Sequence, residues 1–341
     1  MSYLAKKNRY DNFEYRRSGV SGLQLPPITL GLWQHFGGKK ISDQAKKMIF
    51  RAFDRGVTHF DLANNYGVPY GSAEINFGKL IVKELQKYRD ELIISTKAGY
   101  DMWPGPYGNW SSKKYLISSL DQSLSRMNLD YVDIFYSHRF DPLTPLDETA
   151  DALSQAVKQG KALYVGISSY SSKQTIKMNK LLKERGVKCL IHQPSYSMIN
   201  RWIEKDLLKT LKNLKIGCIA FSPLAQGMLS EKYLKNIPKK SRATESNSLK
   251  LNMITNSYKY KVKNLSKIAK KRGQTISQLA ISWVLRNKIV TSALIGARNV
   301  KQLNECLDSL NNLSFTKEEL KEIDKYAKDE DINLWAKSSK Y

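Results

Sequence analysis

Short apolar segments alternate with longer amphipathic segments along almost the whole chain. The apolar segments are rich in Ile, Leu, Val and Phe over their full length, as expected for parallel strands that are buried on both faces. We predict eight such strands, at residues 28–33, 59–63, 92–97, 132–138, 163–168, 190–193, 218–222 and 293–296.

The segments between these strands carry the signals of helices. Residues 44–55 place their apolar side chains on one face, and Pro145 stands where a helix over residues 146–159 would begin. Three further helix starts fit the capping box, in which a Ser or Thr and a Gln or Glu three residues later each accept a backbone N–H. These pairs are Ser171 with Gln174, Thr275 with Gln278, and Thr316 with Glu319.

This alternation predicts an α/β protein whose eight strands close into a (β/α)8 TIM barrel, as one domain over residues 1–341. A Rossmann domain would instead need a GxGxxG turn after an early strand, with an acidic residue about 20 positions further on. No such motif is present in the sequence. We also expect a hairpin within residues 14–25 to cover the bottom of the barrel.

Two long segments interrupt the alternation. Residues 99–112 (GYDMWPGPYGNWSS) follow the third predicted strand, and the polar residues 227–256 follow the seventh. Active sites of such barrels lie on the loops that follow strands. We therefore expect both long loops to face substrate or cofactor at the C-terminal face of the barrel.

The chain is strongly basic, with 56 Lys and Arg against 31 Asp and Glu and a formal net charge of +25. Such a charge attracts nucleic acid, membrane surfaces or small phosphorylated molecules. The basic residues are scattered, for example as the doublets Lys46–Lys47 and Lys270–Lys271, and no RNA-binding signature accompanies them. We therefore expect the charge to favour an anionic cofactor and substrate, and no nucleic-acid partner.

The cysteines Cys189, Cys218 and Cys306 are widely spaced and form no CxxC pair. This pattern is typical of reduced thiols in a cytoplasmic protein and gives no zinc site. No window approaches the ~20 uncharged apolar residues of a membrane helix, and no apolar stretch of a signal peptide follows the charged first residues. We expect a cytoplasmic protein with no metal and no membrane partner.

Polar side chains stand at the ends of the second, third and fourth predicted strands. Asp61 ends the second strand, and Tyr66 lies in the loop after it (HFDLANNYG). Lys97 ends the third strand (IISTKAGY), and His138 ends the fourth (FYSHRFD). Taken singly, each residue is more often a cap, turn or rim residue. Because neighbouring barrel strands end at the same rim, we expect the four side chains to converge.

The four side chains also complement one another chemically. A tyrosine hydroxyl, with a pKa of about 10, is a weak acid unless a nearby cation stabilises its phenolate. Lys97 supplies such a cation, and Asp61 can hold Lys97 through an ion pair. His138 can orient a substrate carbonyl by hydrogen bonding. The set predicts proton donation by Tyr66 to a developing alkoxide, with no nucleophile paired with a base.

These four residues, in this order and context, resemble the catalytic tetrad of the aldo-keto reductase family. That resemblance implies binding of NADPH on a (β/α)8 barrel without a Rossmann fold. The strings STKAGYDMWPGPYG and FDLANNYG are similar to the branch that holds bacterial L-glyceraldehyde 3-phosphate reductases and potassium-channel β-subunits. Further matching strings are GLW at residues 31–33, VDIFYSHR, GISSYS, IHQPSYS, FSPLAQG and LIGAR.

The resemblance implies that NADPH or NADP+ crosses the barrel mouth. It assigns Ser168 and Gln193 to the nicotinamide carboxamide and Phe221 to its ring, although a strand Phe is also typical of plain core. Lys232 and Arg242 match cationic phosphate contacts, although on their own they also fit a solvated loop. The residues implied to bind the cofactor are Trp33, Asp61, Ser168, Gln193, Phe221, Ser222, Leu224, Gln226, Gly227, Lys232, Arg242, Gly296, Arg298, Gln302 and Glu305.

Two positions depart from this branch. Arg298 stands where those relatives have a serine, and an arginine fork there suits the 2′-phosphate that distinguishes NADPH from NADH. Cys306 stands where they have an asparagine that contacts adenine. We expect the loss of that contact to weaken cofactor binding.

The resemblance implies that the protein reduces small aldehydes, above all L-glyceraldehyde 3-phosphate and methylglyoxal, with Tyr66 as proton donor and His138 positioning the carbonyl. Trp33, Trp103 and Tyr107 are expected to shape the substrate pocket, with core packing as an equal alternative, and Trp335 can reach it in the same way. A regulatory subunit that senses redox state through bound NADPH, as channel β-subunits do, remains the alternative. The sequence also leaves open whether the protein forms a homo-oligomer.

Overall fold

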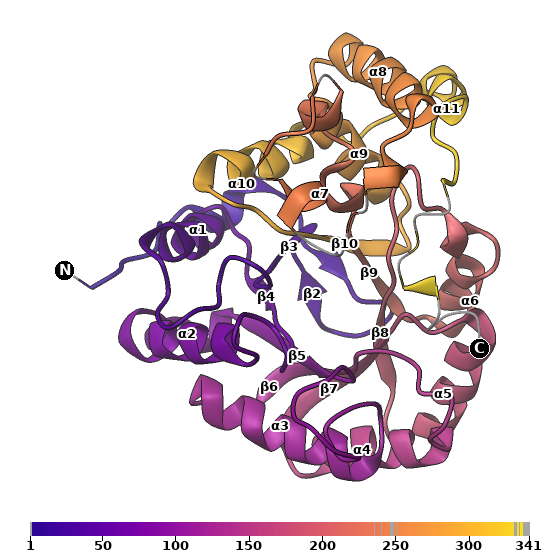
Figure 1. Ribbon diagram of the computed structural model, residues 1–341. Helices are drawn as coiled ribbons and strands as arrows, with labels where there is room; N and C mark the ends of the chain where they lie inside the picture. Colours follow the sequence, from indigo (N-terminus) through magenta and orange to yellow (C-terminus); the bar gives the residue numbers. More distant parts are fainter. Residues whose placement is uncertain are drawn as a thin grey trace.

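Eight parallel strands close into a barrel in the computed structural model, which describes residues 2–234, 236–239, 241–245, 249, 251–330, 333, 335 and 336 (Figure 1). The order around the barrel is β10-β3-β4-β5-β6-β7-β8-β9, so neighbours in sequence are neighbours in space and β10 closes on β3. The predicted TIM barrel is therefore confirmed. The strands are β3 (Ile28–Gly31), β4 (His59–Asp61), β5 (Ile93–Ala98), β6 (Val132–Ser137), β7 (Ala162–Ser168), β8 (Cys189–Gln193), β9 (Gly217–Phe221) and β10 (Val290–Ile295).

All eight predicted strands are present, and the largest difference in bounds is at the last one. β10 begins at Val290, whereas the predicted strand began at residue 293. Thr291 and Ser292 hid its start, because polar residues are unusual in a strand that is buried on both faces. Both are at most 2% exposed, and the Ser292 hydroxyl pairs with Thr29 on the neighbouring strand β3 at 2.8 Å.

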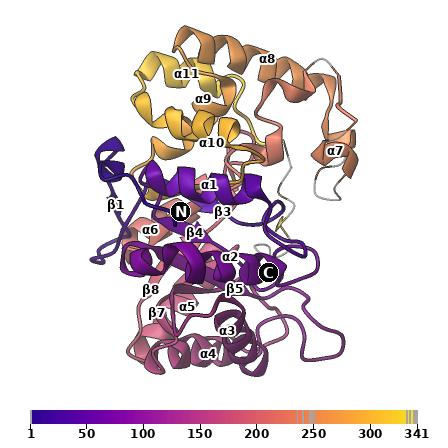
Figure 2. The same cartoon turned by 90° about the vertical axis from the view of Figure 1, so that its left-hand side faces the viewer.

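Helices surround the barrel, and α8 to α11 gather on one side of it in both views (Figures 1 and 2). The three predicted capping boxes are present at the starts of α5, α9 and α11, and α4 begins directly after Pro145. The helices are α1 (Asp43–Asp54), α2 (Ser72–Leu80), α3 (Lys113–Met127), α4 (Leu146–Lys158), α5 (Ser172–Glu184), α6 (Leu207–Leu214), α7 (Arg242–Glu245), α8 (Asn256–Lys271), α9 (Ile276–Leu285), α10 (Val300–Leu307) and α11 (Lys317–Asp324).

The predicted N-terminal hairpin is also present, as the antiparallel strands β1 (Arg16–Arg17) and β2 (Gln24–Leu25). The Ser18 hydroxyl donates to the carbonyl of Leu190 at 3.3 Å, next to the start of β8. Leu25 is fully buried in a cluster that includes Leu190. The hairpin therefore covers the bottom of the barrel, the end away from the strand termini that carry the polar residues.

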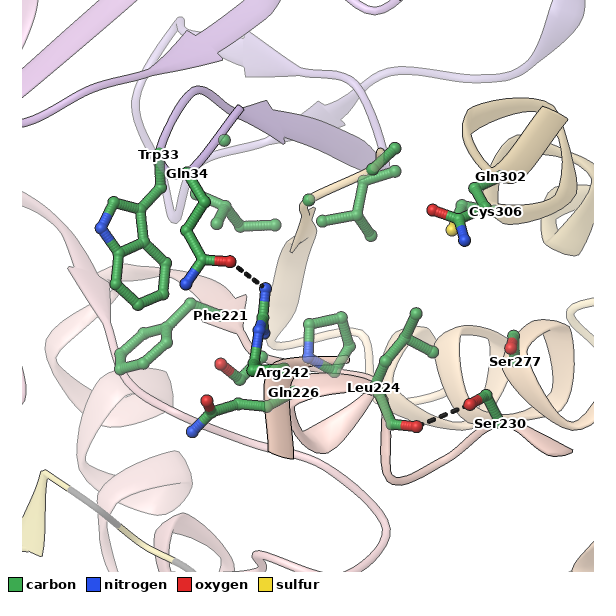
Figure 3. Close-up of a pocket in the computed structure, with 18 of the residues that line it drawn as sticks. Trp33, Gln34, Phe221, Leu224, Gln226, Ser230, Arg242, Ser277, Gln302 and Cys306 are labelled. Atoms are coloured by element: carbon green, nitrogen blue, oxygen red, sulfur yellow. Dashed lines mark hydrogen bonds between the residues drawn. The ribbon is translucent and has the colours of Figure 1, made fainter. Parts of the chain in front are cut away.

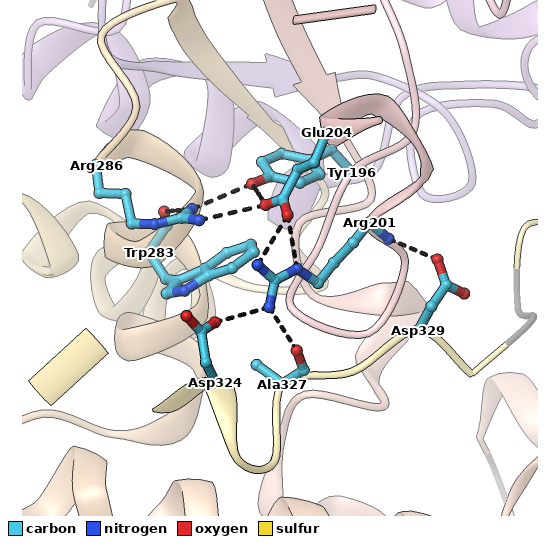
Figure 4. Close-up of polar contacts among 8 residues, drawn as sticks. All are labelled: Tyr196, Arg201, Glu204, Trp283, Arg286, Asp324, Ala327 and Asp329. Carbon is cyan, nitrogen blue, oxygen red and sulfur yellow. Dashed lines mark hydrogen bonds and ion pairs between the residues drawn. The ribbon is translucent and has the colours of Figure 1, made fainter. Parts of the chain in front are cut away.

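Arg201 fastens the C-terminal segment to the loop after β8 (Figure 4). Its guanidinium donates to Asp324 Oδ1 at 2.7 Å and to the carbonyl of Ala327 at 2.6 Å. It also pairs with Glu204 at 2.8 Å, and Glu204 in turn accepts from Arg286 at 3.2 Å. Because one side chain binds three groups from two segments, residues 324–327 are held against the barrel by charge-assisted hydrogen bonds.

Candidate active site

The four predicted catalytic residues converge at the rim where β4, β5 and β6 end. Asp61 is the last residue of β4, and Tyr66 lies in the loop that follows it. Lys97 lies in β5 and pairs in register with the neighbouring strand β6, which His138 directly follows. The expected convergence is therefore what the structure shows, since parallel strands carry their terminal side chains to one end of the barrel.

Asp61 and Lys97 form a fully buried ion pair. Lys97 Nζ donates to Asp61 Oδ2 and, at 2.6 Å, to the carbonyl of Leu62. The other carboxylate oxygen, Oδ1, accepts from Ser95 Oγ at 2.7 Å and from Gln193 Nε2 at 3.2 Å. Burial lowers the pKa of Lys97, whereas the charge and hydrogen bond of Asp61 oppose that shift. The pair is therefore satisfied on both sides, as a buried charge requires.

Tyr66 and His138 lie between this pair and the cavity. Lys97 Nζ is 5.1 Å from the centre of the Tyr66 ring, and the His138 ring meets that ring edge-on at 6.0 Å. Burial raises the pKa of Tyr66 well above 10, so the hydroxyl carries its proton at neutral pH. Burial, with the nearby Lys97 and Arg139 charges, lowers the pKa of His138 well below 6.5. The site thus presents a protonated tyrosine and a neutral imidazole.

A cavity of about 930 Å³ opens beside Tyr66 and His138. It extends to α10, where Gln302 and Cys306 line it (Figure 3). Asp61 and Lys97 lie behind its wall rather than in it. Both groups of predicted ligand contacts, at the barrel mouth and at α10, line this one cavity. The predicted residues in its lining are Trp33, Tyr66, His138, Ser168, Gln193, Phe221, Ser222, Leu224, Gln226, Gly227, Lys232, Arg242, Gly296, Arg298, Gln302 and Glu305.

Two predicted substrate residues, Trp103 and Tyr107, do not line this cavity. The loop over residues 99–112 folds back on itself, with the Met102 N–H donating to the Gly108 carbonyl at 2.9 Å. The Trp103 ring packs on Tyr115 of α3 at 5.3 Å, and Tyr107 is 57% exposed. Of residues 99–112, only Tyr100 reaches the cavity lining, edge-on to the His138 ring at 4.7 Å. The expectation that the whole loop faces the ligand was therefore wrong.

The later loop, over residues 227–256, faces the cavity as expected through several of the residues that the structure describes. Lys232 and Arg242 both line the cavity, and Arg242 donates to Gln34 Oε1 at 3.0 Å (Figure 3). Trp335 also lines the cavity, edge-on to Phe221 at 4.7 Å. Residues 235, 240, 246–248 and 250 of this loop lie outside the described part of the chain.

Several lining residues had no signal in the sequence. Gln34 and His35 follow the first barrel strand, and Lys270 lies in α8 at a position that the sequence alone would assign to the exposed face. Lysine and glutamine are so common on surfaces that their type carries no information about a site. Only the packing of α8 against α9 brings Lys270 to the cavity.

The lining fits a dinucleotide with several phosphates. Lys232, Arg242, Lys270 and Arg298 contribute four positive charges, against the two carboxylates Glu231 and Glu305. At Gly296, an added Cβ would meet nothing within 4 Å, so this side of the wall is open. The N-terminus of α10, capped by Asn299, adds N–H groups of the kind that bind phosphate.

The loop after β9 carries two further signs of a ligand. Ser222, Ala225 and Gln226 adopt left-handed backbone conformations, with φ of 55°, 44° and 59°. Such conformations are costly for residues other than glycine and cluster at functional sites. Gln226 Oε1 is buried and has no hydrogen-bond partner within the described residues, so a ligand N–H would satisfy it.

The described residues include neither a candidate metal site nor a helix that could span a membrane. No group of three or more His, Cys, Asp or Glu side chains is placed to hold a metal ion. None of the helices in that part of the chain is long and apolar enough to cross a membrane.

Comparison with known proteins gives two results. The sequence model of the aldo/keto reductase family matches residues 27–328. The L-glyceraldehyde 3-phosphate reductases of Escherichia coli O157:H7 and Escherichia coli strain K12 are each 54% identical to the chain over 344 aligned positions, which cover 99% of both partners. The resemblance drawn from the motifs is therefore confirmed over the whole length.

Proposed function

Because the chain belongs to the aldo/keto reductase family, we propose that it uses NADPH to reduce small aldehydes, with L-glyceraldehyde 3-phosphate as the first substrate to test. The observation that carries this proposal is the buried Asp61–Lys97 pair beside a protonated Tyr66 at the wall of a cationic cavity. The name of the relatives supports the phosphorylated aldehyde, since the alignment with them covers 99% of each chain.

The residues at the two ends of the cavity would hold NADPH. Ser168 and Gln193 border the end near Tyr66, while Arg298 and Lys270 border the end near α10. When bound, the reduced nicotinamide supplies a hydride to the substrate carbon. Cations at the α10 end favour the extra 2′-phosphate of NADPH over the bare ribose of NADH.

Tyr66 is the proton donor in this proposal. Its high pKa keeps the proton on the hydroxyl until charge develops on the substrate oxygen. A lysine ammonium has three N–H groups, and those of Lys97 that bind Asp61 and the Leu62 carbonyl account for two of them. The remaining one is available toward Tyr66, where the positive charge stabilises the phenolate as the proton leaves.

His138 orients the carbonyl in this proposal. A neutral imidazole has one N–H to donate, and its Nδ1 has no hydrogen-bond partner within the described residues. Tyr100 packs edge-on against the ring and limits its rotation. His138 can thus hold the substrate oxygen within reach of Tyr66 without competing as an acid.

The cavity favours a small anionic aldehyde. Trp33 is exposed at the cavity wall near Tyr66, and the Arg242 guanidinium lies 5.8 Å from its ring centre. The net charge of +25 adds a long-range attraction for phosphorylated substrates. Methylglyoxal, which is small and uncharged, fits the same contacts without that advantage. The alternative of a regulatory subunit gains no support from similarity to two reductases.

The test is consumption of NADPH with L-glyceraldehyde 3-phosphate and with methylglyoxal, in wild type, Tyr66→Phe and Tyr70→Phe. Tyr70 lies four residues further along and is 56% exposed, so it controls for the loss of a tyrosine hydroxyl. We expect Tyr66→Phe to lose about 10²–10⁴-fold in turnover, with NADPH binding unchanged, and Tyr70→Phe to match wild type. Binding of NADPH without turnover of either aldehyde by wild type would refute the proposal.

A further inference from the structure

A continuous chain of buried hydroxyl and imidazole groups runs from the Asp61–Lys97 pair into the barrel. Ser95 of β5 contacts Asp61, His59 of β4 contacts Ser95, and Thr29 of β3 contacts His59. Ser292 of β10 ends the chain at Thr29. All four side chains are fully buried, and their strands are consecutive around the barrel. None of these residues was singled out by the sequence motifs.

The distances along the chain are those of good hydrogen bonds. Ser95 Oγ lies 2.7 Å from Asp61 Oδ1, and His59 Nε2 lies 2.9 Å from Ser95 Oγ. Thr29 Oγ1 lies 3.0 Å from His59 Nδ1 and 2.8 Å from Ser292 Oγ. The alternation of strand residues explains the alignment, because His59 and Asp61, like Ser95 and Lys97, are two apart and point to the same side.

The carboxylate fixes the direction of every bond in the chain. An ionised carboxylate only accepts, so Ser95 must donate its single proton to Asp61 Oδ1. Ser95 then has only lone pairs for His59, so Nε2 must carry the imidazole proton. In a neutral ring Nδ1 is then an acceptor, so Thr29 donates to it. Thr29 in turn accepts from Ser292.

His59 is held neutral by its surroundings. Burial lowers the pKa of His59 to about 4, with the Asp61 charge opposing and the Lys97 charge reinforcing this shift. Tyr136, Cys189 and Cys218 of the interior also have pKa values raised by burial and stay uncharged at neutral pH. A cationic His59 would force Thr29 to turn its proton toward Ser292 and would break the common direction.

We propose that Ser292, Thr29, His59 and Ser95 form a polarised hydrogen-bond chain that holds the Asp61 carboxylate and so keeps Lys97 charged beneath Tyr66. His59 and Ser95 are then positioning residues of the reaction, and this role rests on the proposed reductase function. All donors point toward Asp61, so each bond strengthens the next. Apolar side chains would fill the same space but would leave Oδ1 with Gln193 as its partner.

A matched pair of variants separates this role from packing. His59→Gln places an amide near the Nε2 position and can still donate to Ser95, whereas His59→Asn reaches only the Nδ1 position and the Thr29 side. Both replace a ring by a primary amide. We expect His59→Gln to retain at least about threefold more turnover than His59→Asn, since a weakened bond of this kind changes rates by small factors. Equal losses, or the reverse order, would overturn the proposal.

Ser95→Ala removes the bond to the carboxylate itself. We expect turnover to fall between about tenfold and 100-fold, the range for losing a hydrogen bond to a charged group, with KM for the aldehyde changed by less than about threefold. The alkaline limb of the pH profile should move to lower pH, because Lys97, whose pKa burial already lowers, then loses its charge at a lower pH while Tyr66 is still protonated. The titratable side chains around Lys97 are not substituted in this variant; they are Asp61, Tyr66, Glu74, Tyr136, His59 and His138. A lower rate with an unmoved limb would overturn the proposal.

Ser282→Ala is the control for burying an alanine in place of a hydrogen-bonded serine. Ser282 on α9 is also fully buried and bonds to Gln274 and to the carbonyl of Ser309, both at 3.0 Å. We expect this variant to lose stability while keeping the pH profile of wild type. Equal movement of the limb in both serine variants would show that the shift reports loosened packing and would overturn the proposal.

Nitrogen-15 spectra of the histidine rings test the chain without any turnover. The protein has four histidines, so His59→Gln identifies the His59 signals by their loss. We expect the neutral Nε2–H form of His59 at pH 7 in wild type. An Nδ1–H form, or a cationic ring at pH 7, would overturn the inference even in an active reductase. Because these spectra need no aldehyde, failure of the proposed function would be seen separately, in the NADPH assay.

Discussion

The substitution Asp61→Asn tests the electrostatics of the site directly, because it removes one charge and keeps the shape of the side chain. Lys97 would then be fully buried without its carboxylate partner. Removing one member of a buried ion pair costs about 3–5 kcal/mol. We expect the free energy of unfolding to fall by about that amount at pH 7, and turnover to be lost.

The loss of stability should depend on pH in a defined direction. Burial already lowers the pKa of Lys97 below 10.5, and Asp61 supplies the two largest effects that oppose this shift. In Asp61→Asn the folded-state pKa of Lys97 therefore falls further. Between that value and 10.5 the unfolded chain binds a proton that the folded protein lacks, so stability rises with pH by up to about 1.4 kcal/mol per unit. The deficit is largest at low pH and shrinks as the pH approaches 10.5.

Urea unfolding at several pH values between about 6 and 9 measures this effect. The control is Asp121→Asn, which makes the same change in an exposed ion pair with Lys161 and should cost less than about 1 kcal/mol at every pH. If Asp61→Asn showed the same pH dependence as wild type, Lys97 would not be the titrating group. A cost no larger than that of Asp121→Asn would mean that the pair contributes little to the fold.

Three further predictions concern the imidazole, the cofactor end and the C-terminal segment. Methylglyoxal does not titrate, and the pKa of His138 is well below 6.5, so kcat/KM for this aldehyde should stay constant from about pH 6 to 8. A fall in kcat/KM at acidic pH that disappears in His138→Gln would contradict this. Arg298→Ala should weaken binding of NADPH by about tenfold or more while changing the binding of NADH little. Substitution of the nearby exposed residue, Lys301→Ala, is the control. Equal losses of affinity for both nucleotides in a fluorescence titration would argue against a 2′-phosphate contact. Arg201→Met should lower the free energy of unfolding in urea by about 2–3 kcal/mol, since the bonds to Glu204, Asp324 and the Ala327 carbonyl are lost. Lys180→Met, in an exposed helix pair, should lower it by less than about 1 kcal/mol. Equal costs would show that the Arg201 contacts do not hold the C-terminal segment.

The barrel and the candidate catalytic residues could be predicted from the sequence because their signals are local. Strands buried on both faces give uninterrupted apolar runs, and capping boxes need only two residues three apart, as at Ser171 and Gln174. Asp61, Lys97 and His138 stand out only as a set, because each ends an apolar run and neighbouring barrel strands end at the same rim. Eight such runs in alternation with helices then leave the barrel as the fold that brings those ends together.

Tertiary structure alone decided which other side chains share the site. Trp103 and Tyr107 have the aromatic character of a pocket, but their loop closes on itself and turns Trp103 onto Tyr115. Lys270 has the character of a surface residue, but the packing of α8 brings it to the cavity. The direction of a loop side chain depends on contacts with residues far away in the sequence, which no local pattern records.

The interior chain below Asp61 shows the same division most clearly. His59 and Ser95 are visible in the sequence as polar residues two before Asp61 and Lys97, and alternation alone places each pair on one side of its strand. Their partners Thr29 and Ser292 lie 263 residues apart and meet only because β10 closes on β3. The sequence by itself determined the elements and the candidate reacting groups, whose patterns are short. The closure of the barrel decided the hydrogen bonds that join them, because those bonds depend on distances that exist only in the folded chain.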